Sequence, residues 1–296
     1  MYTFGAISKQ QSLRESVMDS NSKTTHEATG MTPADWALAW SEHLRRSGLE
    51  ANLRRAGVTE EAFWERFGAW SDTLERSGYP GELLERLMAL VRPGDSVLDI
   101  GAGAGAYAIP VARVASRVTA VEPSEIQCTR LQRNVENARL SNVTIVRSRW
   151  EDIEPSRIEP HHVVLAAFCF QMHDIRAALD AMCQVARRSL VLIHADRHDL
   201  RETLTEVCGI EAGPNYEYIE AELRAMGHVP DVDILTRIYR VLLETQLDIL
   251  QYNPGLTLAQ CDSLREYLGS EGRLLTDDGQ TLLERRIDTA FIHVAL

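Results

Sequence analysis

The stretch Val97-Leu98-Asp99-Ile100-Gly101-Ala102-Gly103-Ala104-Gly105 decides the fold of this chain. Its first four residues are apolar except for Asp99, which is typical of a short buried strand. Three glycines follow at alternate positions, and glycine permits positive φ angles and lets a ligand approach the backbone closely. The stretch therefore predicts a strand that ends in a ligand-binding turn at the start of a helix.

Strands and helices are expected to alternate on the C-terminal side of this turn. The apolar patterns predict strands at 96–100, 117–121, 143–147, 162–167 and 189–194, and helices at 107–115, 125–138 and 175–186. Further strands are expected at 247–251 and 289–295, after a mainly helical insertion at about 200–246. This order predicts an α/β fold, with a doubly wound, mostly parallel seven-stranded sheet and helices on both faces.

The first 90 residues show no such alternation. Residues 1–30 are polar, and we expect them to form a flexible tail rather than a targeting sequence. Residues 31–90 are expected to form a helical N-terminal cap, and residues 91–296 the ligand-binding domain. Aromatic residues of the cap, including Trp70, either pack the helices onto the core or cover a substrate pocket.

Composition limits the classes of partner. The formal net charge of −12 has the wrong sign for following a phosphate backbone, so we expect a small-molecule substrate and no nucleic acid. The longest apolar run, near 163–170, is far shorter than the roughly 20 residues that cross a bilayer, so no membrane partner is expected. The five cysteines form no C-x-x-C pair, which predicts reduced thiols and a cytoplasmic location. The oligomeric state is left open.

The glycine spacing alone allows two kinds of nucleotide site. A dinucleotide fingerprint requires its third small residue at position 106, and Ala106 is an accepted variant there. The acid Asp99, two residues before Gly101, favours a nucleotide site that is not the dinucleotide type. An acid followed by a G-x-G-x-G loop resembles the first motif of the class I S-adenosylmethionine (SAM)-dependent methyltransferases.

This resemblance implies the cofactor and the residues that hold it. The loop backbone would surround the methionine and ribose of SAM, and Glu122, at the end of the second strand, would accept hydrogen bonds from the ribose hydroxyls. The cofactor-binding residues that we predict are Asp99, Gly101, Ala102, Gly103, Gly105, Glu122, Pro123, Trp150, Glu151 and Ala167.

The chain departs from the family pattern after the third strand. Arg149 stands where an acid that contacts the adenine is often found, so this contact would pass to Glu151 or Asp152. Trp150 would pack on the adenine ring. The alternative is that Trp150 is buried at the edge of the sheet.

Methyl transfer from a sulfonium displaces an activated leaving group, so alignment and desolvation can supply most of the rate. A hydroxyl or thiol acceptor would also need a base. His173, after the fourth strand, is the predicted catalytic base; the alternative is an ordinary residue at a helix start. The predicted substrate contacts are Gln171, Trp70 and Tyr239, although Tyr239 also fits a plain amphipathic helix.

No metal is expected. His194, Asp196 and His198 alternate like ligands, but no fourth ligand is apparent. The predicted function is SAM-dependent methylation of an oxygen, nitrogen, sulfur or carbon atom of a small molecule. Two alternatives stay open: a regulatory or scaffold subunit of the same fold without catalysis, and an NAD-dependent oxidoreductase.

Overall fold

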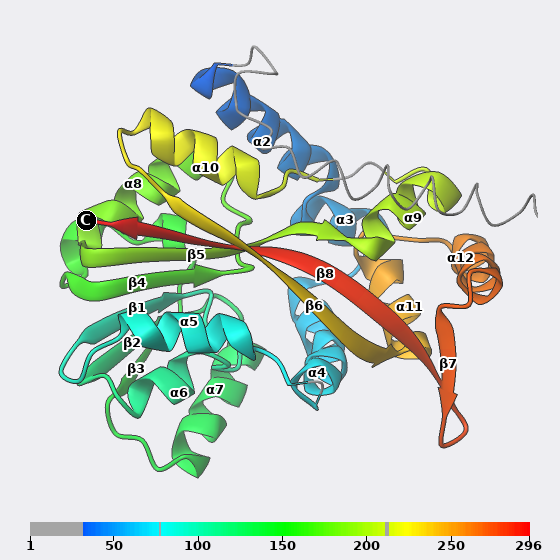
Figure 1. Ribbon diagram of the computed structural model, residues 1–296, viewed down its shortest axis with the longest axis horizontal. Helices are drawn as coiled ribbons and strands as arrows, with labels where there is room; N and C mark the ends of the chain where they lie inside the picture. The colour runs from blue at the N-terminus through cyan, green and yellow to red at the C-terminus, as the bar shows by residue number, and fades with distance from the viewer. Residues whose placement is uncertain (1–31, 77, 211–212) are drawn as a thin grey trace, which may run out of the picture. The chain divides into compact units, whose positions relative to one another are not determined.

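The computed structural model describes residues 32–76, 78–210 and 213–296. Within these ranges the central sheet has eight strands in the order β3-β2-β1-β4-β5-β8-β6, with β7 paired to β8 outside this path (Figure 1). The predicted fold class is confirmed, because the sheet is mostly parallel and helices flank it, although it has eight strands and not the expected seven. The parallel strands are β1 (Ser96–Ile100), β2 (Arg117–Val121), β3 (Val143–Val146), β4 (His161–Ala167) and β5 (Ala186–His198).

The register of the parallel strands brings their carboxyl ends to one edge. In β1, Ile100 lies opposite Val121 of β2 and Ala166 of β4. All five residues of β1 are buried, as expected of a central strand that is covered on both faces. The turns that follow β1, β2 and β4 therefore lie side by side, where open α/β sheets bind ligands.

Two long antiparallel strands, β6 and β8, form a ribbon that extends beyond the parallel strands of the sheet. β6 (Asp231–Leu242) pairs with β8 (Gln280–Ala295) along its whole length, whereas only the second half of β8 pairs with β5. The first half of β8 therefore continues with β6 beyond the parallel strands (Figure 1). β7 (Leu274–Asp277) pairs with the start of β8 at the far end of this ribbon.

Helices cover both faces of the sheet (Figure 1). One face carries α5 (Glu82–Leu90), α6 (Ala108–Ala112) and α7 (Glu125–Asn137), and the other carries α8 (Ile175–Val185) and α10 (Tyr216–Ala225). Leu87 and Leu131 are fully buried in the first core, and Leu179 and Met182 in the second. The two short turns η2 (Trp150–Asp152) and η3 (Pro155–Arg157) join β3 to β4.

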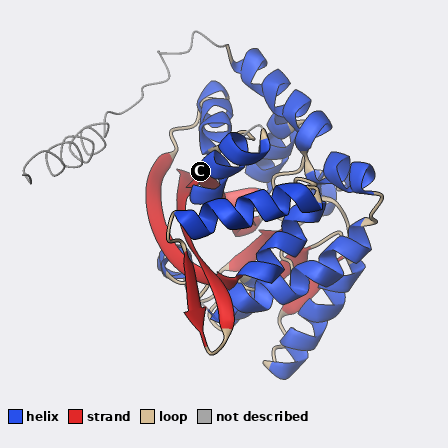
Figure 2. Cartoon of the chain, turned by 90° about the vertical axis from the view of Figure 1, so that its right-hand side faces the viewer, coloured by secondary structure: helices blue, strands red, loops and turns tan. Residues whose placement is uncertain are grey.

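The remaining helices form a cap with the ribbon. They are α2 (Pro33–Ser47), α3 (Leu49–Ala56), α4 (Glu60–Arg76), α9 (Asp199–Cys208), α11 (Leu243–Tyr252) and α12 (Leu258–Ser270). α2 packs on α8 and α10, while α4 packs on α7, α11 and β6. Figure 2 shows the cap helices and the β6–β8 ribbon from the side that they occupy. The N-terminal and late segments of the chain thus build the cap together.

Two sequence predictions in this region are wrong. Residues 247–251, expected as a strand, belong to α11, whose buried Leu243, Leu247 and Leu250 recur at helical spacing. The insertion at 200–246 is helical only in α9 and α10, since residues 231–242 form β6. Periodicity alone does not distinguish a strand from a helix in short apolar runs. A helix was therefore predicted where β6 forms, and a strand where α11 forms.

Some predictions fall outside the described structure. The tail at 1–30 lies there entirely, and so does the side chain of Trp70, although its backbone belongs to α4. The proposed boundaries of tail, cap and domain stay predictions. All five cysteines are free. Among the described helices, none combines the length and apolar character needed to cross a membrane.

Candidate functional site

The glycine loop after β1 adopts the backbone conformation that its sequence predicts. Gly101, Gly103 and Gly105 have φ angles of 71°, 54° and 98°. A Cβ atom at Gly101 would collide with the side chain of Cys169, and one at Gly105 would lie 2.5 Å from Cδ1 of Leu131. A Cβ at Gly103 would meet no atom within 4 Å. Two glycines are thus required by close packing, and the third faces open space beside the loop.

Glu122 joins the end of β2 to this loop. One carboxylate oxygen accepts a hydrogen bond from the N–H of Gly103 at 2.9 Å, and the other accepts from the N–H of Ser124 at 2.9 Å. The side chain is buried, which raises the pKa of its carboxyl, while the two hydrogen bonds act in the opposite direction. A buried carboxylate is therefore held beside the open space at Gly103. Pro123 follows it directly.

Asp99 lies deeper, at the end of β1. It is 2% exposed, and its Oδ2 atom has no hydrogen-bond partner among the described residues. Burial raises the pKa of Asp99 to about 7, the charge of Glu122 adds to this effect, and a hydrogen bond from the Ala108 backbone opposes it. Buried carboxylates are normally paired, so this oxygen is suited to a cationic ligand group.

A second group of unsatisfied polar atoms adjoins Asp99. The Tyr107 hydroxyl lies beside Tyr79 without a hydrogen bond of normal geometry, and Asp99 and Arg237 both influence its pKa, which burial raises well above the ordinary value. The Arg237 guanidinium lies 5.3 Å from the ring centre of Tyr79 and 5.8 Å from that of Phe168. Its Nε atom is buried and makes no hydrogen bond within the described residues.

The sequence analysis missed this second group. Tyr79, Tyr107, Phe168 and Arg237 come from four separate parts of the chain, and no local pattern links them. The positive φ of 54° at Phe168 marks a strained backbone in a non-glycine residue, which often occurs at functional sites. That strain was not visible in the sequence.

The segment after β3 provides fewer contacts than expected. Trp150 is buried in the core beside α8, and its indole N–H donates to the Ala178 carbonyl at 3.1 Å. Its surroundings match the alternative of a packed tryptophan, and an adenine contact stays a prediction. Glu151 is exposed. Arg149 pairs with Glu60 of α4 at 2.7 Å, so it ties the cap to this edge of the sheet.

The loop after β4 is held by the cap. Ala167 ends the strand, and the Gln171 side chain accepts a hydrogen bond from the N–H of Leu49 at 3.1 Å. The buried Trp40 donates from its indole nitrogen to the Met172 carbonyl at 2.9 Å. His173 is exposed and precedes Asp174, which caps α8 by accepting from the N–H of Ala177. Gln171 and His173 therefore lie in one loop at the predicted edge of the sheet.

Two further residues that the sequence analysis considered, Tyr239 and His194, lie in strands of the sheet. Tyr239 lies in β6, not in a helix, and its buried ring lies 5.9 Å from the Arg285 guanidinium. His194, in β5 just beyond the part that pairs with β4, lies between Trp40 and Phe170, with ring-centre distances of 6.0 and 5.2 Å. Desolvation lowers the pKa of His194 to about 4, and the nearby Pro214 carbonyl does not have hydrogen-bond geometry to it.

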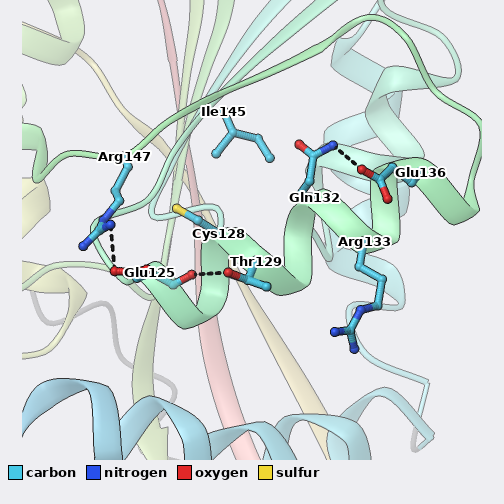
Figure 3. Close-up of a pocket in the computed structure, with 8 residues that line it drawn as sticks. All are labelled: Glu125, Cys128, Thr129, Gln132, Arg133, Glu136, Ile145 and Arg147. Atoms are coloured by element: carbon cyan, nitrogen blue, oxygen red, sulfur yellow. Dashed lines mark hydrogen bonds and ion pairs between the residues drawn. The ribbon is translucent and has the colours of Figure 1, made fainter.

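A hollow of about 490 Å³ lies outside this site, between α7 and β3 (Figure 3). Two pairs of its polar side chains bind each other: Arg147 pairs with Glu125 at 2.8 Å, and Gln132 donates to Glu136 at 2.8 Å. Arg133 also lines the hollow. Among the described residues, no cluster of three or more His, Cys, Asp or Glu side chains could hold a metal ion, and the side chain of His198 lies outside them.

Comparison with known proteins identifies this arrangement. Residues 97–189 match a family model described as a methyltransferase domain. The described structure has the fold of the class I SAM-dependent methyltransferases around this segment. The comparisons thereby confirm the predicted methyltransferase fold and support SAM as its cofactor, and the activity of the whole chain is a proposal. The roles of individual residues stay predictions.

Individual relatives agree with this assignment. The chain is 32% identical over 155 residues to an S-adenosyl-L-methionine-dependent Diels-Alderase from Neonectria sp., covering 49% of this chain and 61% of that protein. It is 32% identical over 137 residues to ribosomal RNA small subunit methyltransferase G of Mycolicibacterium smegmatis, covering 44% and 54%. The crystal structure of YcgJ from Bacillus subtilis, at 15% identity, superposes with a TM-score of 0.54 over 72% of this chain and 97% of that one. The first listed curated relatives are matched over 61% of their lengths, less than two thirds.

Proposed function

We propose that this chain is an enzyme that transfers a methyl group from SAM to a small-molecule acceptor. The observation that carries the proposal is the position of Glu122, which is buried and hydrogen-bonded to Gly103 beside the unpaired oxygen of Asp99. Both carboxylates belong to the motifs that the resemblance to class I SAM-dependent methyltransferases assigns to the cofactor.

The residues around the glycine loop suit the chemistry of SAM. The methionine part of SAM carries an ammonium and a carboxylate, and its ribose carries two hydroxyl donors. We assign the ribose hydroxyls to Glu122 and the ammonium to Asp99, whose free oxygen would gain a cationic partner. We assign the carboxylate to Arg237, with the Tyr107 hydroxyl as a second donor. This set pairs each unsatisfied charge with a group of opposite sign.

The bound cofactor supplies a methyl group that is already activated by its sulfonium. The chain then has to align the acceptor and exclude water. α4 closes one side, because Glu60 pairs with Arg149 and Gly68 packs against Arg130 of α7. Where the acceptor is a hydroxyl or thiol, His173 would take its proton, because an exposed imidazole can pass that proton to solvent. The methyl group ends on the acceptor, and S-adenosylhomocysteine leaves.

A small molecule fits the charge of this chain better than RNA. One relative is named as a ribosomal RNA methyltransferase. The chain itself has 43 acidic and 31 basic residues, excluding histidine, so its overall field repels phosphate backbones. The experiment is to incubate the purified chain with SAM and either pools of metabolites or total ribosomal RNA, and to measure S-adenosylhomocysteine. We expect turnover with metabolite pools; turnover with RNA alone would overturn the proposed acceptor class.

A further inference from the structure

A cavity of about 1260 Å³ lies within the cap, between α2 and α3 on one side and α9, α11 and the loop before α12 on the other. It is at least as large as the pockets of about 300–1,000 Å³ that take whole organic molecules. None of the assignments above uses it.

The charge of its lining is opposite to that of the chain. Arg46, Arg55, Arg201 and His43 line the cavity, whereas no Asp or Glu does so within the described residues. The chain as a whole carries an excess of acids, with a formal net charge of −12. A concave surface with charges of one sign concentrates ligands of the opposite sign.

Arg201 has its charge only partly balanced. It is half-buried on α9 and donates to main-chain carbonyls, those of Asp196 at 3.2 Å and of Gly213. No ion pair of Arg201 with a carboxylate is formed among the described residues. Burial lowers the pKa of Arg201 more than the charge of Asp196 raises it. An oxyanion in the cavity would supply a stronger partner than these carbonyls.

Arg55 is held in place by a buried polar side chain. Asn52, 1% exposed, accepts a hydrogen bond from the guanidinium of Arg55. The amide nitrogen of Asn52 donates to the Ser47 carbonyl at 2.9 Å and to the Asn253 side chain at 2.6 Å. Arg55 is thereby fixed to α2 and to the end of α11, which prepares it to bind a ligand with little loss of side-chain entropy.

The walls of this cavity continue to the methyl-transfer edge. Trp40, one turn before His43 on α2, holds the Met172 carbonyl, and Leu49, one turn before Asn52, holds Gln171. On the other side, Arg201 and Pro214 both lie near His194 of β5. The cavity is therefore lined by the same helices, α2 and α3, that contact the loop after β4.

We propose that this cavity binds the acceptor, and that the acceptor carries a carboxylate or phosphate group recognised by Arg55 and Arg201. The inference rests on the proposed function, because it assigns the second substrate of that reaction. It goes beyond that function because it predicts that the acceptor is an anion and that it binds in the cap cavity.

The test uses calorimetric titration of the full chain, saturated with S-adenosylhomocysteine, with citrate and with inorganic phosphate as probes. We expect both anions to bind the wild type, and Arg55→Gln and Arg201→Gln each to weaken citrate binding about tenfold, the effect of losing one charge-assisted hydrogen bond. The matched control is Arg113→Gln, because Arg113 is an exposed arginine at the C-terminal end of α6. This variant should bind citrate as tightly as the wild type does. Unfolding temperatures and S-adenosylhomocysteine affinity, measured on each variant, show whether it is folded.

The outcomes separate the two proposals. If S-adenosylhomocysteine binds and the two variants bind citrate as tightly as Arg113→Gln does, the anionic acceptor is overturned and the methyltransferase proposal stands. If Arg201→Gln does not fold, Arg55→Gln decides, since its side chain lies on the cavity surface. If the wild type does not bind S-adenosylhomocysteine, the proposed function fails, and the assignment of the cavity to an acceptor fails with it.

Discussion

The carboxylate of Glu122 accepts a hydrogen bond from the main-chain N–H of Gly103 at 2.9 Å, which connects the turn after β2 to the turn after β1. The same N–H belongs to the one glycine of the loop that faces open space. The hydrogen bond therefore places the predicted ribose-binding residue, Glu122, beside this open space.

Replacing Glu122 tests this role. Glu122→Ala removes the acceptor for the ribose hydroxyls and leaves the Gly103 and Ser124 N–H groups without their partner, so we expect S-adenosylhomocysteine to bind at least about tenfold more weakly. Isothermal titration measures this. Glu136→Ala, at the far end of α7, is the matched control and should keep the wild-type affinity. Equal affinities for the two variants would remove Glu122 from the cofactor site.

Asp99 predicts a dependence on pH. Its pKa in the folded chain, about 7, lies above the ordinary value of 3.8. Between these pH values the folded protein keeps a proton that the unfolded chain has lost, so the free energy of unfolding of the ligand-free protein falls as the pH rises through this window. Urea unfolding at pH 5 and pH 8 should show this fall in the wild type, and a smaller one in Asp99→Asn.

The same shift acts on ligand binding with the opposite sign. A cationic ammonium prefers the ionised form of Asp99, so the affinity for S-adenosylhomocysteine should increase from pH 5.5 to pH 8. Asp99→Asn should bind more weakly and show little dependence on pH across this range. A wild-type affinity that is constant from pH 5.5 to 8 would contradict the assignment of the ammonium to Asp99.

Arg237 predicts a difference between two ligands. We expect Arg237→Gln to weaken S-adenosylhomocysteine binding about tenfold. It should not change the affinity for S-adenosyl-3-thiopropylamine, which lacks the carboxylate. Arg240→Gln, on the same strand and already paired with Glu284 at 3.2 Å, serves as the control. A loss that is equal for both ligands would indicate a general change of structure and not recognition of a carboxylate.

His173 predicts an effect on rate without an effect on cofactor binding. For a hydroxyl or thiol acceptor, His173→Ala should lower kcat about 100-fold or more near neutral pH, which is typical of losing a general base. The affinity for S-adenosylhomocysteine should stay the same. His228→Ala, beyond α10, controls for the loss of a histidine. An unchanged pH–rate profile in His173→Ala would exclude this residue as the base.

The part of the site that sequence could predict is the part made by adjacent residues. Asp99, the three glycines and Glu122 lie within two strands and the turns that follow them, so their spacing alone places them together. The mostly apolar β1 and the continuous apolar run in the second part of β4 are also local signals of a central sheet. These features agree with the structure because they depend on few long-range contacts.

The remaining features depend on distant packing. The predicted secondary structures of β6 and α11 are reversed, because their apolar patterns fit the period of a strand as well as that of a helix. Arg237 reaches Tyr79 and Phe168 only because the β6–β8 ribbon extends beyond the parallel strands. Likewise, Arg55 and Arg201 come together through the packing of the cap helices, and neither stands in a recognisable motif.

The central claim is that the glycine loop, Asp99 and Glu122 bind SAM and not a nicotinamide dinucleotide. Calorimetric titration of the wild-type chain with S-adenosylhomocysteine and, separately, with NAD tests it most directly. The account predicts saturable binding of S-adenosylhomocysteine that is lost in Glu122→Ala, and no binding of NAD. Binding of NAD without binding of S-adenosylhomocysteine would contradict it.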